Sequence, residues 1–272
     1  MSWTALRITP DANRDGVIAA LFASGSRGIL EDGAALVTHF PPDAAVDAIR
    51  SAVLDADPRA TLSITAAPAV DYSSWRASVS AHRIGGLVIT PPWLAAEFDS
   101  ATTIVVDPVM AFGTGEHATT RSVVRLMQGV IRPGDVVADL GAGSAVLSIA
   151  AVRLGAARVA AIELDQDAIG NAEENVRAND VADRVEVIEG DAGTLLPLLA
   201  PVRVVLANII SSVLIPLLPT LRASLTADGQ AILSGILHEE RDEVVAALHA
   251  GNWLIEREDT EDVWWSVQIT RR

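Results

Sequence analysis

Three stretches between residues 107 and 163 contain the side chains best suited to chemistry. The first, from Asp107 to Thr120, reads DPVMAFGTGEHATT. The second, residues 136–144, reads VVADLGAGS and joins an apolar run to a glycine-rich turn. Such a turn lets a ligand approach the backbone closely, and the helix that follows offers free N–H groups to it. The third, residues 159–163, is another apolar run that ends in Glu163.

Glu163 stands where an α/β nucleotide-binding protein reaches a ribose. It ends an apolar run twenty residues after Gly143, and an acidic side chain at that distance binds ribose hydroxyls in such folds. A dinucleotide fingerprint would be Gly-x-Gly-x-x-Gly, but Val146 occupies the third glycine position. The nicotinamide-cofactor interpretation therefore loses support.

The hydrophobic pattern predicts the elements that position these residues. From residue 102 onward, apolar runs of strand length alternate with segments of helical periodicity. Strands are expected at 102–106, 135–140, 158–163, 185–189, 202–207, 229–234, 253–258 and 263–270, and helices at 117–130, 144–154, 166–179, 211–225 and 239–250. This alternation predicts a doubly wound parallel sheet. The last two strands have no helix between them, so they would make the sheet mixed.

The first sixty-five residues predict a smaller domain of another class. Strands are expected at 3–9, 28–40 and 61–65, and helices at 11–24 and from Pro41 onward. The turn dipeptide Asp32-Gly33 divides the second strand into a hairpin. The resulting order, β-α-β-β-α-β, is typical of a ferredoxin-like α+β domain. No nucleophile–base set occurs in it, so a docking role is expected.

Residues 66–100 are expected to connect domain 1–65 to a larger domain of residues 101–272. The connector is rich in Pro and Gly but also carries Trp75 and Trp93, so it is not a plain flexible linker. The two tryptophans either pack at a domain junction or line the pocket that a substrate side chain enters.

Composition narrows the classes of function. All twenty basic residues are arginine, and the net charge is −15. This negative net charge disfavours direct nucleic-acid binding, because that binding depends on neutralising phosphates. The chain has no cysteine, and its five histidines lack metal-ligand spacing, so no metal is expected. No apolar run is long enough to cross a bilayer, and the N-terminus lacks the apolar core of a signal peptide. A cytoplasmic protein without a membrane partner is expected.

The glycine-rich turn and the acid after it resemble the first two motifs of the class I S-adenosyl-L-methionine-dependent methyltransferases. In that family the turn makes room for the methionine and ribose parts of the cofactor, and the acid binds both ribose hydroxyls. The resemblance implies that Gly141, Gly143 and Glu163 contact the cofactor. A carboxylate that accepts two O–H groups makes hydrogen bonds of the strong, charge-assisted kind.

Two further polar residues follow later strands. Asp191 stands where the family often places an acid near the adenine amine, although a turn-forming aspartate is an equal alternative. Asn208 stands where many amino-group methyltransferases carry Asn/Asp-Pro-Pro-aromatic, whose Asn holds the nucleophilic nitrogen. Ile209, Ile210 and Ser211 replace the Pro-Pro-aromatic part. That departure argues against the groups that methylate adenine N6 or glutamine.

The stretch from Asp107 to Thr120 resembles the ribosomal protein L11 methyltransferase family. The elements Trp75-Arg76, Pro91-Pro-Trp93, Asn208-Ile and Leu233-Ser-Gly-Ile-Leu237 agree with it. The resemblance covers the connector and the C-terminal domain by motif, and the N-terminal domain by layout. It implies a seven-stranded Rossmann-like methyltransferase sheet, S-adenosylmethionine as cofactor, and methylation of lysine or α-amino groups of protein L11, which the N-terminal domain docks. Related protein-lysine methyltransferases share Phe-Gly-Thr-Gly-x-His but lack that domain.

The resemblance also implies roles for single residues. Those that match the family's cofactor contacts are Thr120, Gly141, Glu163 and Asn208. Those that match the loop covering the cofactor and bordering the acceptor are Phe112, Gly113, Thr114 and Gly115, which with Asn208 are expected to form the catalytic site. The chain departs from the family pattern at Val109 and Ala145, where Gly is common, at Ala118, where Pro is common, and at Arg76, where Lys is common. None of these departures removes a polar contact, but Val109 and Ala145 affect the shape of the backbone.

His117 is either a direct base or a structural residue at the start of the following helix. Methyl transfer from a sulfonium to an amine mainly requires a neutral nitrogen held in line with the methyl group. A structural role is therefore the simpler expectation.

Three functions remain open at this stage. The first is a methyltransferase, expected to be monomeric, that acts on L11. The second keeps the chemistry but acts on another protein lysine or on a small-molecule amine. The third is a non-catalytic module that binds a cofactor or a protein.

Overall fold

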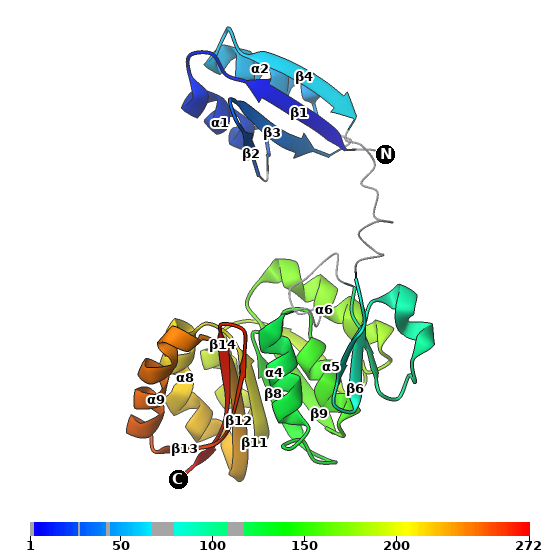
Figure 1. The fold of residues 1–272 in the computed structure, drawn as a ribbon, viewed down its shortest axis with the longest axis vertical. Helices are drawn as coiled ribbons and strands as arrows, with labels where there is room; N and C mark the ends of the chain where they lie inside the picture. The colour runs from blue at the N-terminus through cyan, green and yellow to red at the C-terminus, as the bar shows by residue number, and fades with distance from the viewer. Residues whose placement is uncertain (1–2, 27, 42–43, 67–78, 108–116) are drawn as a thin grey trace. The chain divides into compact units, whose positions relative to one another are not determined.

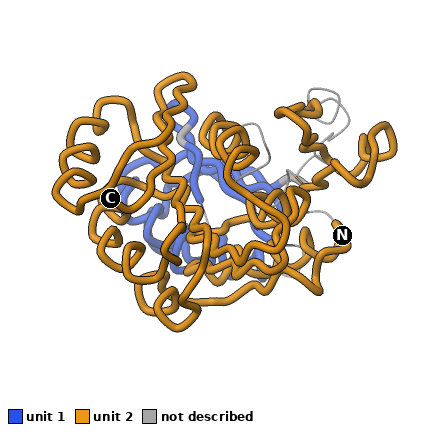
Figure 2. Tube along the Cα trace, turned by 90° about the horizontal axis from the view of Figure 1, so that it is seen from below, with its two compact units in different colours: residues 1–78 blue, residues 79–272 orange. Residues whose placement is uncertain are grey.

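The structure of the 272-residue chain is a computed structural model, which describes residues 3–26, 28–41, 44–66, 79–107 and 117–272. Contacts within the chain divide it into two compact units, residues 1–78 and 79–272 (Figure 2). Residues 66–100, expected as a connector, therefore contribute to both units.

The first unit is an antiparallel sheet with two helices. Its elements are β1 (Thr4–Thr9), α1 (Arg14–Ala23), β2 (Leu30–Asp32), β3 (Ala35–Phe40), α2 (Val46–Ala56) and β4 (Thr61–Ala66). The strand order is β2-β3-β1-β4. Alternate strand residues such as Leu6, Ile8 and Leu36 are fully buried and pack with Leu21 and Val53 of the helices. The element order β-α-β-β-α-β agrees with the order expected from the sequence.

A buried carboxylate joins the end of α2 to the start of α1. Oδ2 of Asp57 accepts the backbone N–H groups of Asp11, Ala12 and Asn13 at 2.8, 2.9 and 3.1 Å. These bonds favour the charged form, so the N–H groups of Asn13 and Ala12 in particular hold the pKa of Asp57 down at about 2.

The second unit is built on a mixed sheet of seven strands (Figure 1). The strands are β8 (Val136–Leu140), β9 (Arg158–Glu163), β10 (Val185–Glu189), β11 (Val202–Asn208), β12 (Leu225–Leu237), β13 (Trp253–Glu261) and β14 (Trp264–Arg271). Their order is β10-β9-β8-β11-β12-β14-β13, and β14 runs antiparallel to both of its neighbours. The predicted seven-stranded, Rossmann-like methyltransferase sheet with an antiparallel strand near one edge is confirmed.

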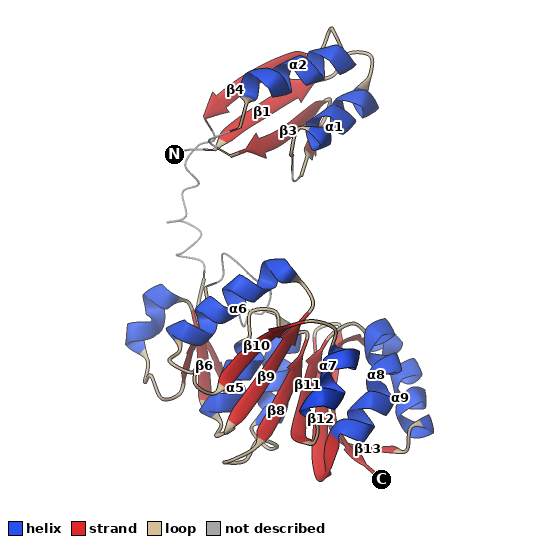
Figure 3. Cartoon of the chain, turned by 180° about the vertical axis from the view of Figure 1, so that it is seen from behind, coloured by secondary structure: helices blue, strands red, loops and turns tan. Residues whose placement is uncertain are grey.

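Helices cover both faces of this sheet (Figure 3). The helices on one face are α4 (Ala118–Met127), α5 (Val146–Arg153) and α6 (Gln166–Ala178), and those on the other are α7 (Ala192–Leu199), α8 (Ser211–Ser224) and α9 (Arg241–Ala250). Successive strand residues point to opposite faces. Val137 accordingly packs in the core with the first three helices, whereas Ala138 and Leu140 pack with the other three. The result is a three-layer sandwich.

The strand expected at 102–106 exists, but it does not belong to the large sheet. It is β7 (Thr103–Val105), which pairs in parallel with β6 (Leu87–Thr90), and β6 pairs with β5 (His82–Ile84) in a separate sheet. A 3-10 helix, Pro92–Glu97, lies between β6 and β7. The sequence analysis missed β6 because its three apolar residues and Thr90 are flanked by the Gly and Pro residues of a presumed connector.

Helix α7 was also not predicted. It has only eight residues and contains Pro197, which is unfavourable in a helix interior. Among the described residues, no helix has the length and apolar character that crossing a bilayer requires.

Candidate functional site

A cavity of about 500 Å³ lies at the carboxyl ends of β8, β9, β10 and β11. Its lining includes Gly141 after β8, Glu163 at the end of β9, Asp191 after β10 and Ile209 after β11. Open α/β sheets bind their ligands at this edge because the loops that follow the strands meet there. The strand order therefore brings together three of the residues expected to bind a cofactor.

The glycine-rich turn takes a left-handed backbone at alternate residues. The φ angles of Gly141, Gly143 and Ala145 are +68°, +53° and +61°. A Cβ at position 141 would lie 2.4 Å from Cγ2 of Ile209, so this position requires glycine for space as well as for its φ angle. The backbone N–H of Gly141 donates to the carbonyl of Ile162 at 2.9 Å, which fixes the turn against β9.

Ala145 has a left-handed backbone at the position where the family pattern commonly has glycine. It is fully buried and precedes the first residue of α5. A left-handed alanine costs about 1–2 kcal/mol relative to the right-handed form. The departure therefore introduces strain at the turn.

Glu163 is held in place by backbone N–H groups. Its Oε2 accepts the N–H of Gly143 at 2.8 Å, and its Oε1 accepts those of Leu164 and Asp165, also at 2.8 Å each. An ionised carboxylate has about four acceptor positions, two at each oxygen. The two N–H groups at Oε1 and the one at Oε2 leave a single position open, at Oε2. The group can accept one hydroxyl there without reorienting, and a second hydroxyl would replace one of the N–H donors at Oε1.

Three buried oxygens, two of them at or beside the glycine-rich turn, have no hydrogen-bond partner within the described part of the chain. They are Oδ1 of Asp139, Oγ of Ser144 and Oγ1 of Thr120, and all three residues are fully buried. The other carboxylate oxygen of Asp139 accepts the hydroxyl of Ser148 at 2.7 Å. Burial raises the pKa of Asp139 to about 6. Buried polar atoms are nearly always paired in folded proteins, so this set is suited to a polar ligand.

Asn208 ends β11 beside the start of α4. Its Nδ2 donates to Oγ1 of Thr119 at 3.4 Å. The next residue, Ile209, donates its backbone N–H to the carbonyl of Ser234 at 3.1 Å. Gly235 follows with a φ of +79°, and a Cβ there would lie 2.6 Å from the carbonyl oxygen of Ile209. The position of Asn208 is thus set by the close approach of β12.

Asp191 has a local structural role, but as the cap of a helix rather than as the turn-forming residue that the sequence analysis offered as an alternative. Its Oδ1 accepts both the N–H and the hydroxyl of Thr194, at 2.9 and 2.8 Å, and so caps α7. It also lines the cavity. Contact between Asp191 and a ligand stays a prediction.

His117 occupies the residue before α4, as the structural interpretation expected, but its side chain makes no capping hydrogen bond. Thr120 lies in the first turn of the same helix. The expected loop residues Phe112, Gly113, Thr114 and Gly115 lie outside the described residues, as do Val109, Trp75 and Arg76.

The apolar wall of the cavity was not predicted. Large side chains there are well exposed, with Leu164 at 70%, Ile210 at 60% and Val213 at 48%. Exposed apolar side chains gathered in one place often mark a binding site. The available signal was Ile209-Ile210 in place of Pro-Pro, which keeps apolar surface after Asn208.

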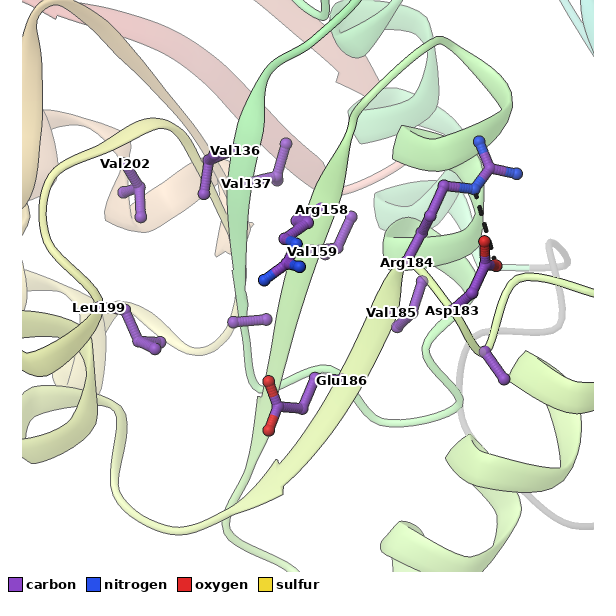
Figure 4. Close-up of a pocket in the computed structure, with 12 residues that line it drawn as sticks. Val136, Val137, Arg158, Val159, Asp183, Arg184, Val185, Glu186, Leu199 and Val202 are labelled. Atoms are coloured by element: carbon purple, nitrogen blue, oxygen red, sulfur yellow. Dashed lines mark ion pairs between the residues drawn. The ribbon is translucent and has the colours of Figure 1, made fainter.

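A second cavity, of about 520 Å³, lies at the amino ends of the same strands (Figure 4). Val136, Leu199 and the charged residues Arg158, Arg184 and Glu186 are part of its lining. None of the residues expected to do chemistry lies in it, so the first cavity is the candidate site.

The strand order, the glycine-rich turn after β8 and the acid that ends β9 together define a protein of the Rossmann-like methyltransferase class. A family model described as "Ribosomal protein L11 methyltransferase (PrmA)" matches residues 27–272. The chain belongs to that family.

Similar proteins carry the same description. A ribosomal protein L11 methyltransferase of Desulfitobacterium hafniense is 40% identical over 192 residues, which are 69% of this chain and 61% of that protein. One of Pelobacter propionicus is 39% identical over 207 residues, 74% of this chain and 66% of that protein. This chain thus spans about three fifths of the length of the curated relatives it matches.

Solved structures agree on the fold. The crystal structure of ribosomal protein L11 methylase from Lactobacillus delbrueckii subsp. bulgaricus matches this chain with a TM-score of 0.63 and 29% identity. The match covers 71% of this chain and 100% of the crystallised chain. A precorrin-6y C5,15-methyltransferase of Geobacter metallireducens shares the fold at 21% identity, with a TM-score of 0.50 over 61% of this chain.

Proposed function

We propose that this chain is an S-adenosylmethionine-dependent protein N-methyltransferase that acts on lysine or α-amino groups of ribosomal protein L11. The observation that carries the proposal is the carboxylate of Glu163, which three backbone N–H groups orient at the cavity beside Gly141. The open position at Oε2 suits a ribose hydroxyl, which would donate a charge-assisted hydrogen bond to it. Family membership and the descriptions of the relatives support L11 as the acceptor.

The residues at the cavity fit S-adenosylmethionine, which when bound supplies an electrophilic methyl group on a sulfonium. Glu163 would accept the ribose hydroxyls, and the exposed apolar wall would pack against the adenine. Oδ1 of Asp191 is engaged by the α7 cap, so its Oδ2 would receive the adenine amine. The buried oxygens of Asp139 and Thr120 suit the charged amino-acid end of the cofactor.

The chain's own contribution to the transfer is to hold a neutral amine in line with the methyl group. A lysine amine in water has a pKa near 10.4, so a site that excludes water favours the neutral form. The Asn208 side chain is restrained through its amide nitrogen by Thr119, which leaves Oδ1 to accept an N–H of the attacking amine. Residues 112–115 would border this acceptor position, as the family resemblance implies.

We assign the docking of L11 to residues 1–65, the transfer to residues 101–272, and the connection to residues 66–100. The first unit has the element order expected of a small α+β domain, and the net charge of −15 would attract a basic protein partner. We expect the chain to act as a monomer, without binding nucleic acid or membrane itself.

Mass spectrometry of purified L11 after incubation with this protein and S-adenosylmethionine tests the proposal. The mass should rise in steps of one methyl group. Glu163→Ala removes the ribose acceptor, and a lost hydrogen bond to a charged group is worth about 1.5–3 kcal/mol. Cofactor affinity in calorimetry should therefore fall about tenfold to a hundredfold, and L11 should gain little mass.

Glu173→Ala is the matched control, because it removes a glutamate from α6 that makes only an exposed ion pair with Arg177, at 2.5 Å. It should methylate L11 like the wild type. Unchanged cofactor affinity in Glu163→Ala would refute the ribose assignment. Cofactor binding without a mass gain would refute L11 as the acceptor and leave the cofactor site standing.

A further inference from the structure

Three asparagines lie one turn apart along the buried side of α6, two within the helix and the last as its C-terminal cap. They are Asn171, Asn175 and Asn179, and their exposed fractions are 7%, 3% and 2%. Residues four apart share one face of a helix. Asparagine is a poor helix former, and burying its amide is unfavourable unless the amide is hydrogen-bonded. The bonds that these amides make therefore show what the face does.

The side chain of Asn179 is hydrogen-bonded to β7, the strand that precedes the stretch 107–120. Its Oδ1 accepts the N–H of Val105 at 2.8 Å, and its Nδ2 donates to the carbonyl of the same residue at 2.7 Å. The amide thus replaces the neighbouring strand that β7 lacks on this side. Arg153 of α5 adds a bond of 3.0 Å to the carbonyl of Thr103 and one of 2.8 Å to that of Asn179.

Asn175 reaches the glycine-rich turn. Its Nδ2 donates to the carbonyl of Ser144 at 3.0 Å and to Oδ1 of Asn171 at 2.9 Å, while its Oδ1 accepts the N–H of Asp107 at 3.4 Å. One amide therefore contacts both the turn and the end of the β7 segment. The turn is in turn bonded to Glu163, because Gly143 donates its N–H to that carboxylate.

We propose that Asn175 and Asn179 are positioning residues that set residues 105–107 at a fixed distance from the glycine-rich turn. The two amides and the helix turn between them are called the asparagine bridge. The proposal rests on the proposed function, because the segment that begins at Asp107 carries the motif of the family. A helix is a rigid spacer. The end of α6 therefore holds residues 105–107 in a fixed position relative to the glycine-rich turn, which lies about forty residues later in the sequence.

The bridge acts on cofactor affinity without touching the cofactor. Without it, the backbone from Val105 to Asp107 loses the side-chain bonds that fix it, and ordering the segment would then take place on binding. Such ordering weakens affinity even when every direct contact is kept. A misplacement of about 1 Å near a reacting centre can also lower a rate about a hundredfold.

The test compares Asn175→Ala and Asn179→Ala with Asn171→Ala. The control removes a buried amide from the same face of α6. Within the described residues, Asn171 accepts a bond from Nδ2 of Asn175 but makes none to residues 105–107 or to Ser144, so the bonds that define the bridge are kept. Affinity for S-adenosylhomocysteine is measured by calorimetry, at a temperature where circular dichroism shows every variant folded. Hydrogen exchange of a peptide covering residues 103–107 is followed in the absence of ligand.

We expect both bridge variants to bind about tenfold more weakly, which is the loss of one or two hydrogen bonds, and Asn171→Ala to stay within about twofold of wild type. Residues 103–107 should exchange faster in the bridge variants alone. Alanine is a better helix former than asparagine, so the loss in Asn175→Ala should not follow from a weaker helix. Asn179 is the C-cap of α6 and its Nδ2 also donates to the carbonyl of Asn175 at 2.8 Å, so circular dichroism must show that the helix is kept in Asn179→Ala.

Four outcomes contradict the proposal. Equal affinity in wild type and bridge variants would remove the bridge while leaving the cofactor site. Unchanged exchange of residues 103–107 would show that the segment is held by other means. An equal loss of affinity in Asn171→Ala would assign the effect to the packing of α6. A wild type that binds no S-adenosylhomocysteine would overturn the proposed function together with the bridge.

Discussion

The contact between Gly235 and Ile209 gives the sharpest prediction about the second unit. A Cβ at position 235 would lie 2.6, 2.8 and 2.9 Å from the carbonyl oxygen, carbonyl carbon and amide nitrogen of Ile209. All three are backbone atoms, so no side-chain rotation can relieve the clash. Gly235 also has a φ of +79°. Gly235→Ala should therefore disturb both the bend in β12 and the loop that follows Asn208.

The size of the effect follows from three terms. A left-handed alanine costs about 1–2 kcal/mol, and forcing a methyl group into packed structure costs about 1–3 kcal/mol. Alanine also restricts the unfolded chain, which offsets about 0.4–1 kcal/mol of this. We expect the free energy of unfolding to fall by about 1–4.6 kcal/mol, with about 3 kcal/mol as the central value. Because Ile209 lines the cavity, cofactor affinity should fall as well.

Gly134→Ala is the matched control. Gly134 has a φ of +90°, and no heavy atom would lie within 4 Å of its Cβ. It carries the same kind of backbone penalty without the clash, so a loss of only about 1 kcal/mol is expected.

Urea unfolding followed by tryptophan fluorescence measures both variants. Four of the six tryptophans fall in the second unit, including the buried Trp253 and Trp265, so the signal reports mainly on that unit. A loss for Gly235→Ala within about 0.5 kcal/mol of that for Gly134→Ala, near the usual error of such comparisons, would refute the reasoning. Ile209 would then be free to move, and the close approach of β12 would not fix Asn208.

Three further predictions concern charged groups. The pKa of Asp57 is lowered from its ordinary value of 3.8 to about 2, so the charged side chain stabilises the fold above pH 3.8 and this effect is lost as the pH falls toward 2. The difference in the free energy of unfolding between wild type and Asp57→Asn should therefore narrow between about pH 5 and 2. A constant difference would contradict this. Burial raises the pKa of Asp139 to about 6, so the free energy of unfolding of the wild type should fall by up to about 3 kcal/mol relative to that of Asp139→Asn as the pH rises from 4 to 7. Urea unfolding at the two pH values measures this difference. No relative loss would mean that the site is not desolvated. Arg125 donates to Asp259 through two nitrogens, at 2.8 and 2.6 Å, so Arg125→Ala should lower the free energy of unfolding by about 1–3 kcal/mol. The control Arg132→Ala breaks an exposed ion pair with Asp228 at 3.5 Å and should lower it by less than about 1 kcal/mol. Equal losses in urea unfolding would show that the Arg125 pair adds no stability.

Local pattern was sufficient to predict that the strands of the large sheet exist, because each contains a short apolar run, although β12 and β13 extend through polar residues beyond the predicted ranges. Sheet membership was not, since it depends on contacts between distant segments. The three residues of β7 have a strand pattern but pair with β6 rather than with β8. The helix α7 was missed because Pro197 and its short length weaken the helical pattern.

The site was predictable where a motif fixes the backbone. Gly141 and Glu163 line one cavity, as their positions at the ends of adjacent strands indicated. The close approach of Gly235 to Ile209 depends on how β11 and β12 are offset, which a single sequence does not reveal. The spacing of Asn175 and Asn179 is visible in the sequence, but their partners lie on other segments.

The short helix α7 gives the two cavities of the second unit a common wall. Asp191 at its amino end lines the candidate site, and Leu199 at its carboxyl end lines the cavity of Figure 4. Eight helical residues span about 12 Å, so this wall separates the two spaces by roughly that distance. A substitution that slides α7 along its axis would enlarge one cavity and reduce the other. The volumes of the two cavities, at opposite edges of the sheet, would therefore change together. The affinity for a ligand in one cavity would then depend on the residues that line the other.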